Sequence, residues 1–118
     1  MLNFPPSVRI CLAVGATDMR KGFDGLAAVA QHAMGEDPFT GHVFVFCNRR
    51  RDLLKLLVWD RAGFWVLAKR LEEGTFAWPD DVGAVASVDK TTRELMCILE
   101  GIDLRDARLR KRLQRTPS

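Results

Sequence analysis

The sequence predicts an α+β fold, an antiparallel β-meander of about four to five strands packed by two helices, with a basic C-terminal tail. Short runs rich in Val, Phe, Leu and Trp follow one another through the middle of the chain, separated by turn residues, as in a meander. On either side, apolar residues recur at intervals of three and four, the spacing of one helical face. The length of 118 residues and the hydrophobic content of 47% suit one core. We therefore expect a single domain over residues 1–104 and a tail over residues 105–118.

The first third of the chain is predicted to contain a strand and a helix. Residues 8–14 are apolar apart from Arg9, which is typical of a strand. From Asp18 onward, helical spacing continues as far as Gly35, a natural helix stop. The apolar residues on this face are Met19, Phe23, Leu26, Ala30 and Ala33.

Two glycines complicate the start of this helix. Gly22 and Gly25 would each cost a helix about 1 kcal/mol relative to alanine, so something must compensate for them. Either another backbone or a ligand approaches this face closely, or the helix begins later with Asp24 as its N-cap. The sequence leaves both interpretations open.

The central segment supplies the strands of the meander. Residues 43–47 are apolar without interruption, which predicts a strand that is covered on both faces. Residues 53–59 and 64–67 are predicted to form the next two strands, because the polar residues at 60–63 favour a type I hairpin turn.

The C-terminal third is predicted to add a short strand and a second helix. Residues 75–78 can form a strand that Pro79 ends. After a polar, alanine-rich link, Asp89 is expected to cap a helix that stops at Gly101. The core-facing residues of this helix are Leu95, Ile98 and Leu99.

The net charge of +3 is unevenly distributed along the chain. Residues 105–115 hold six of the 18 cations against one of the 15 anions, a local charge of +5, so the rest of the chain carries 12 cations and 14 anions, or −2. Such a tail suits sequence-independent contacts with phosphates, although basic chain ends are also often merely solvated. The candidate phosphate-binding residues here are Arg108, Arg110, Lys111 and Arg112.

A second basic cluster, Arg49, Arg50 and Arg51, is predicted to lie in a hairpin loop held by its two flanking strands. Arginine side chains presented in this way can bind phosphate oxygens. Lys55 and the pair Lys69-Arg70 extend a basic face along the meander if the alternation of the strands places them on one side. The alternative is a charged loop that keeps the hairpin soluble, with Asp52 as a local counter-ion.

Aromatic residues beside these cations allow two interpretations. Stacking on unpaired bases is one way in which single strands are held, and it requires Trp65 or Trp78 to be exposed. Packing between the sheet and a helix is the alternative. The residues concerned are Trp59, Phe64, Trp65, Phe76 and Trp78.

The residue types that carry catalysis are not arranged for it. Neither His32 nor His42 lies in a metal-ligand spacing, and the chain has neither a phosphate-binding loop nor a nucleophile elbow. Strand transfer by two metal ions would need clustered carboxylates. The carboxylates in this sequence are instead accounted for by structural roles in helix caps, turns and helix ends. These are Asp18, Asp24, Asp60 and Asp103. We expect no catalytic residue, metal or cofactor.

The three cysteines, Cys11, Cys47 and Cys97, are widely spaced among apolar neighbours, which predicts reduced core thiols. No apolar run approaches the roughly 20 residues of a membrane span, and the N-terminus lacks the sections of a signal peptide. We expect a cytoplasmic protein without a membrane partner.

Five blocks of the chain, taken in order, resemble a bacterial protein family. They are Asp18 to Leu26; Asp37-Pro38-Phe39 with Gly41-His42 and Phe44; the Arg-rich turn before Lys55; Trp59 to Pro79; and Leu99-Glu100-Gly101-Ile102-Asp103. The sequence resembles the small TnpB-like accessory proteins of the insertion sequence sixty-six family, which are unrelated to the RNA-guided nucleases of the same name. The resemblance covers nearly the whole chain. It implies a role in transposition beside a separate, larger transposase and supplies no catalytic residues.

The expected function is therefore that of a non-catalytic accessory protein for transposition, which contacts DNA at the element ends, the transposase, or both. A docking module without DNA contact is the alternative, and a small metal-dependent nuclease is the weakest interpretation. The sequence does not predict an oligomeric state. Arg20 and Lys21 are predicted to face a partner, because nearby glycines permit close approach; the alternative is a sterically constrained start to the helix.

Overall fold

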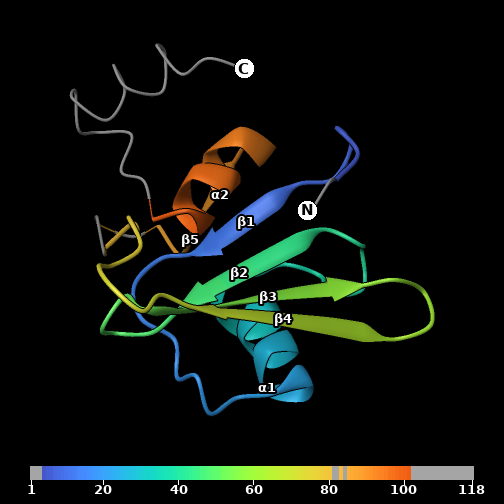
Figure 1. The fold of residues 1–118 in the computed structure, drawn as a ribbon. Helices are drawn as coiled ribbons and strands as arrows, with labels where there is room; N and C mark the ends of the chain where they lie inside the picture. Colours follow the sequence, from blue (N-terminus) through green and yellow to red (C-terminus); the bar gives the residue numbers. More distant parts are fainter. Residues whose placement is uncertain (1–3, 81–82, 84, 102–118) are drawn as a thin grey trace.

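The computed structural model describes residues 4–80, 83 and 85–101, which form a five-stranded sheet with helices on both faces (Figure 1). Helix α1 continues directly into a π-helical turn, η1. In chain order the elements are β1 (Ile10–Ala13), α1 (Phe23–Ala28), η1 (Val29–Ala33), β2 (Val43–Cys47), β3 (Leu53–Trp59), β4 (Phe64–Arg70), β5 (Ser87–Lys90) and α2 (Thr92–Leu99).

The sheet is mixed, with the strand order β4-β3-β2-β1-β5. The predicted antiparallel meander is confirmed for β2, β3 and β4. It is wrong for β1, which pairs in parallel with β2. A parallel pair needs a crossover connection, and α1 with η1 lies in the segment between these two strands. The order of hydrophobic runs could not reveal this, because it does not specify which strands become neighbours.

The predicted short strand at 75–78 is also wrong. Phe76 and Trp78 are buried in an irregular segment, where the indole N–H of Trp78 donates to the carbonyl of Ala13 at 3.0 Å. The fifth strand is instead β5, which lies in the predicted link and helix cap and pairs antiparallel with β1. Its four residues, Ser-Val-Asp-Lys, are too few and too polar to show the alternation that predicts a strand.

Two apolar cores lie on opposite faces of the sheet. The core on the α2 face contains Ile10, Leu12, Val43, Val45, Leu54 and Leu56 together with Leu95, Ile98 and Leu99. The core on the α1 face contains Cys11, Phe44, Phe46 and Leu57 together with Leu26, Ala30 and Met34. All five residues of β2 are buried, which confirms that this strand is covered on both sides.

The two helix starts differ from the predicted ones. Helix α1 begins at Phe23 with Gly22 as its N-cap, which is later than a start at Asp18 and earlier than a start capped by Asp24. Helix α2 is capped by Thr91 rather than Asp89. Thr91 and Glu94 form a capping box in which each side chain accepts from the backbone N–H of the other. The core-facing residues predicted for α2 are confirmed.

The turns follow the predicted positions more closely. Gly35 and Gly101 have positive φ angles after the helices, as expected of helix stops. The hairpin turn at 60–63 has a φ of 78° at Arg61, its first central residue, so it is not the predicted type I turn. The predicted boundary at residue 104 and the tail lie outside the described residues. No helix in the described ranges has the length and apolar character needed to cross a membrane.

Candidate nucleic-acid interface

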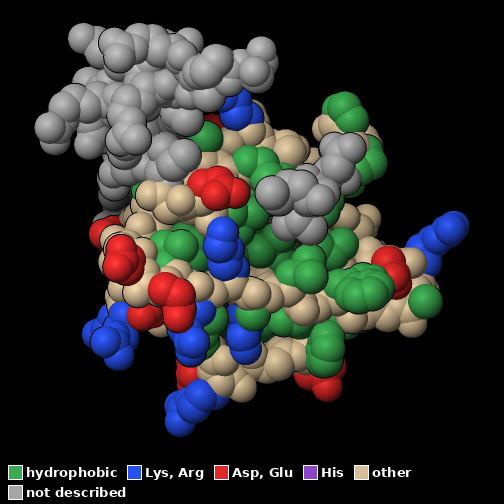
Figure 2. All heavy atoms as spheres, in the orientation of Figure 1, with side chains coloured by type: hydrophobic (Ala, Val, Ile, Leu, Met, Phe, Trp, Pro, Cys, Tyr) green, Lys and Arg blue, Asp and Glu red, His purple; other side chains and the backbone are tan. Residues whose placement is uncertain are grey.

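Two basic segments of the chain meet at one end of the sheet. Leu53 pairs with Arg70, and the N–H of Leu71 donates to the carbonyl of Asp52 at 2.8 Å, so the β2–β3 turn lies beside the end of β4. We call this region, which contains Arg49, Arg50, Lys69 and Arg70, the basic end. Figure 2 shows Lys and Arg side chains gathered on this side of the visible face, interleaved with acidic ones.

Arg51 has a structural role that separates it from its two neighbours. It adopts a φ of 64°, and its Nη1 donates to the carbonyls of Gly15 at 3.1 Å and Asn48 at 3.4 Å. Its Nη2 pairs with Asp80, and only 19% of the side chain is exposed. Arg51 therefore holds the turn against two distant segments.

Arg49 and Arg50 are exposed and make no side-chain hydrogen bond or ion pair with the described residues. Hydrogen bonds hold the turn that carries them: the side-chain oxygen of Asn48 accepts from the N–H groups of Asp52 and Leu53, both at 3.0 Å. These two arginines are thus presented on a fixed turn with their guanidinium donors free.

Lys55 is engaged within the protein. Its Nζ donates to the carbonyls of Met19 at 2.8 Å and Lys21 at 3.2 Å, which fastens the segment before α1 to β3. The register places Lys55 opposite Ala68, so Lys69 points to the other face of the sheet. Arg70 shares the face of Lys55 and pairs with Glu72 at 3.3 Å. The three cations beyond the turn therefore do not form one continuous stripe.

The segment before α1 carries a tight ion pair. Arg20 donates to Asp18 at 2.8 Å, and this hydrogen bonding lowers the pKa of Asp18 to about 2. The Arg20 side chain is 92% exposed. A Cβ on Gly25 would lie 2.9 Å from the Cβ of Lys21, so the missing side chain leaves room for the Lys21 stem. The neighbour at Gly25 is thus a side-chain stem and not the other backbone or ligand that was expected, and partner binding by Arg20 and Lys21 stays a prediction.

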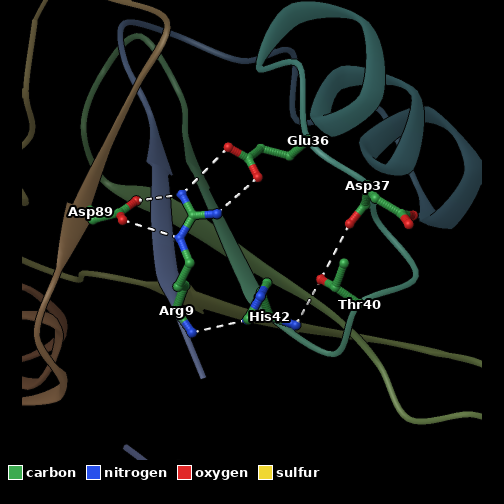
Figure 3. A network of polar contacts seen from close by, with 6 residues as sticks. All are labelled: Arg9, Glu36, Asp37, Thr40, His42 and Asp89. Atoms are coloured by element: carbon green, nitrogen blue, oxygen red, sulfur yellow. Dashed lines mark hydrogen bonds and ion pairs between the residues drawn. The ribbon is translucent and has the colours of Figure 1, made fainter. Parts of the chain in front are cut away.

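Sequence reasoning missed a polar network around Arg9 (Figure 3). The guanidinium lies between the carboxylates of Asp89 and Glu36, each with a contact of 3.1 Å. Its hydrogen bonds to Asp89 and Glu36 raise the pKa of Arg9, and the bond to Asp89 lowers the pKa of that carboxyl. The backbone N–H of Arg9 donates to Nδ1 of His42 at 3.0 Å. Because the guanidinium already bonds to both carboxylates, Arg9 stabilises the fold and is not available to bind a phosphate. The sequence held one sign of this role, a single cation within an apolar run. Lys55 shows the same sign.

The predicted aromatic residues divide between core and surface. Phe76 and Trp78 are buried, whereas Trp65 is 58% exposed and its indole N–H donates to Asp60 at 2.6 Å. Trp59 and Phe64 pack on each other and on Phe39. Base stacking required either Trp65 or Trp78 to be exposed, and Trp65 meets this condition.

The candidate carboxylates are dispersed in the part of the chain that the structure describes. Asp18 pairs with Arg20, while Asp60 accepts from Ala62 and Gly63 in the hairpin turn. No three His, Cys, Asp or Glu side chains lie together as metal ligands among the described residues. Asp103 and the tail candidates Arg108, Arg110, Lys111 and Arg112 lie outside those residues.

The cysteines match their predicted environment in two of three cases. Cys11 and Cys47 are buried, and Cys97 is partly buried. Burial raises the pKa of Cys11 to about 12 and that of Cys47 to about 11, so both thiols stay protonated at neutral pH.

Comparison with known proteins supports the resemblance seen in the sequence. The family described as IS66 Orf2 like protein matches residues 8–109. The chain belongs to this family. Membership associates the protein with an accessory role in transposition of an insertion sequence.

Two relatives come from Sinorhizobium fredii (strain NBRC 101917 / NGR234). The uncharacterized protein y4hO is 38% identical over 105 residues, which cover 89% of this chain and 90% of the relative. The uncharacterized protein y4jC is 39% identical over 79 residues, which cover 67% of this chain and 68% of the relative. No solved structure matches the chain significantly.

Proposed function

We propose that this protein is a non-catalytic accessory factor that contacts DNA phosphates during transposition, with the basic end as its contact surface. The observation that carries the proposal is the pair Arg49 and Arg50, exposed on a turn that Arg51 and Asn48 hold in place. Because the backbone of this turn is already held in place, it loses little backbone freedom when the guanidinium groups bind a phosphate.

Lys69 adds a further exposed cation beside this turn. Contacts of this kind position a protein on DNA without reading sequence, because the phosphate backbone is the same everywhere. Selectivity for the element ends would then come from other groups or from the transposase. The tail residues Arg108, Arg110, Lys111 and Arg112 are proposed to add affinity of the same sequence-independent kind.

The alternative function is docking onto the transposase without direct DNA contact. Large apolar side chains are exposed away from the basic end, with Phe39 at 55% and Trp65 at 58% exposure. Exposed aromatic groups of this size are common at protein interfaces. A metal-dependent nuclease is the weakest candidate, and Mg²⁺-dependent cleavage lost on Asp18→Ala or Asp60→Ala would be needed to support it.

Fluorescence anisotropy with a labelled duplex from the element's end, and with a scrambled duplex, separates these functions when it is titrated with salt. We expect binding to weaken steeply as salt rises. The double variant Arg49→Ala/Arg50→Ala should bind more weakly and lower the slope of log affinity against log salt by about two.

Arg93→Ala is the matched control for this measurement, because Arg93 is an exposed arginine on α2. It should leave the affinity nearly unchanged. Absence of binding at low salt would reject direct DNA contact and favour docking. Equal losses of affinity in the double variant and the control would show that the DNA contact lies outside the basic end.

A transposition assay tests the partner contact proposed for Arg20 and Lys21. The double change of both residues to Ala should lower transposition while circular dichroism shows an intact fold. An unaltered transposition frequency would leave this segment with a structural role only, in which Asp18 and Arg20 pair.

A further inference from the structure

Strand β4 is one edge of the sheet, and its outer side is free in the described structure (Figure 1). The inner side pairs with β3 over all seven residues without a break in register. No backbone hydrogen bond joins the outer side to another described segment. Such an edge presents a row of donors and acceptors that a further strand can pair with.

The hydrogen-bond pattern shows which residues face outward. The N–H of Asp60 donates to the carbonyl of Gly63 at one end of the ladder, and that of Leu71 donates to the carbonyl of Asp52 at the other. Bonded and non-bonded pairs alternate along an antiparallel ladder. The residues of β4 whose backbone groups point away from β3 are therefore Phe64, Val66, Ala68 and Arg70.

The first five residues of this edge lack the usual protection against further pairing. Natural edge strands are often shortened, bulged or charged, or they contain proline. β4 has the sequence Phe-Trp-Val-Leu-Ala-Lys-Arg, in which the first five residues are uncharged. Trp65 is 58% exposed and Leu67 is 39% exposed, both on the face that carries α2. A continuous apolar edge of this kind indicates a strand-pairing surface.

We propose that β4 pairs antiparallel with β4 of a second copy of this chain, which joins the two sheets edge to edge. The proposal goes beyond the DNA contact and does not depend on it. Its basis is the distribution of side chains along the strand, with aromatics at the first two positions and cations at the last two.

Pairing around a two-fold axis at Leu67 uses the whole strand. It places Val66 opposite the second copy's Ala68, and Leu67 opposite its own counterpart. It also places Phe64 opposite Arg70 and Trp65 opposite Lys69, so each aromatic ring meets a cation across the junction. Such cation–π contacts are favourable, and the four outward-facing residues of each copy form bonded pairs.

The charges also favour this orientation over a parallel one. A parallel pairing in register would bring the cations of both copies together at one end, and like charges on neighbouring strands are destabilising. In the antiparallel pairing, Lys69 of the second copy also approaches Asp60, which accepts from the indole of Trp65 at 2.6 Å. Beside this half of β4 lies a shallow hollow of about 530 Å³ lined in part by Phe23, Phe64 and Trp65.

Sedimentation velocity on the full chain tests the proposal. The wild-type protein should form dimers at about 100 μM in the absence of DNA. Leu67→Glu and Leu67→Lys place two like charges opposite each other at the two-fold axis, so each should raise the dimer dissociation constant at least ~10-fold. An equimolar mixture of the two variants should restore dimers, because the opposed charges are then complementary.

A second pair of variants tests the backbone pairing. Ala68→Pro removes an N–H that points away from β3, so it should weaken the dimer while circular dichroism shows an intact fold. Ala68→Ser keeps that N–H and should remain dimeric. A monomeric wild type at this concentration would overturn the proposal. So would a dimer that persists in both charged Leu67 variants, since the contact would then lie elsewhere.

Discussion

At the scale of single residues, three consecutive arginines have different physical roles. Arg51 turns inward at a positive φ and bonds to the carbonyls of Gly15 and Asn48, whereas Arg49 and Arg50 point outward. The same distinction separates Lys55, which donates to two carbonyls before α1, from the exposed Lys69. Buried or bonded cations of this kind contribute to stability, and the free ones are available to bind a ligand.

Replacement of Arg51 by Ala should therefore destabilise the protein much more than replacement of Arg50. Arg51→Ala removes two hydrogen bonds to carbonyls and the pair with Asp80, so we expect the free energy of unfolding to fall by about 1–3 kcal/mol. Arg50→Ala should change it by less than about 0.5 kcal/mol. Urea denaturation measures both values. Equal effects of the two changes would contradict the division of roles.

At the scale of elements, each helix is positioned by hydrogen bonds near its N-terminus and by its contact with the sheet. Helix α1 begins at Phe23, and its N-cap Gly22 offers no side-chain cap; the segment before it is held instead by Lys55 of β3. Helix α2 has a capping box between Thr91 and Glu94 and buries Leu95, Ile98 and Leu99. The start of α2 is thus specified by its own sequence to a greater extent than that of α1.

Loss of the α2 cap should have a measurable cost. Thr91→Ala leaves the N–H of Glu94 without its side-chain acceptor, so we expect the free energy of unfolding to fall by about 1 kcal/mol. Thr92→Ala is the matched control, since a change at the first helical position leaves the box intact and improves helix propensity. Thermal denaturation followed by circular dichroism compares the two. An unchanged free energy of unfolding in Thr91→Ala would show that the capping box contributes little to stability.

At the scale of the whole molecule, the Arg9 network connects segments that are far apart in sequence. Arg9 precedes β1, Asp89 lies in β5, and Glu36 follows η1. The hydrogen bond from Arg9 lowers the pKa of Asp89 below its ordinary value of 3.8. A carboxylate with a lowered folded-state pKa adds stability that is present above its unfolded-state pKa and is lost as the pH falls through its folded-state pKa.

Replacement of Arg9 by Met keeps the apolar stem and removes the charge. At neutral pH we expect the variant to lose about 1 kcal/mol of stability, because the ion pairs are partly exposed and screened by solvent. The difference from wild type should shrink as the pH falls below the unfolded-state pKa of Asp89 and through its lower folded-state pKa, because the carboxylate that pairs with Arg9 is then protonated. Chemical denaturation at several pH values measures this. A difference that is constant with pH would exclude Asp89 as the partner responsible.

The sequence by itself determined the elements whose signals are local. The uninterrupted apolar run of β2, the position of β3, the start of β4, the buried face of α2 and the glycine stops all depend on neighbouring residues, and the structure confirms them. Strand β4 itself runs three residues beyond the predicted end at residue 67. Five ordered blocks also sufficed to indicate the family to which the chain belongs.

Only the tertiary structure decided how these elements are paired and which cations remain free. The parallel pairing of β1 with β2 and the edge strand β5 depend on segments that meet after a crossover. Arg51 finds the carbonyl of Gly15 across 36 positions, and Arg9 finds Asp89 across 80. Partners at such separations leave no periodic or turn signal, because the contact forms only once the sheet has brought the distant segments together.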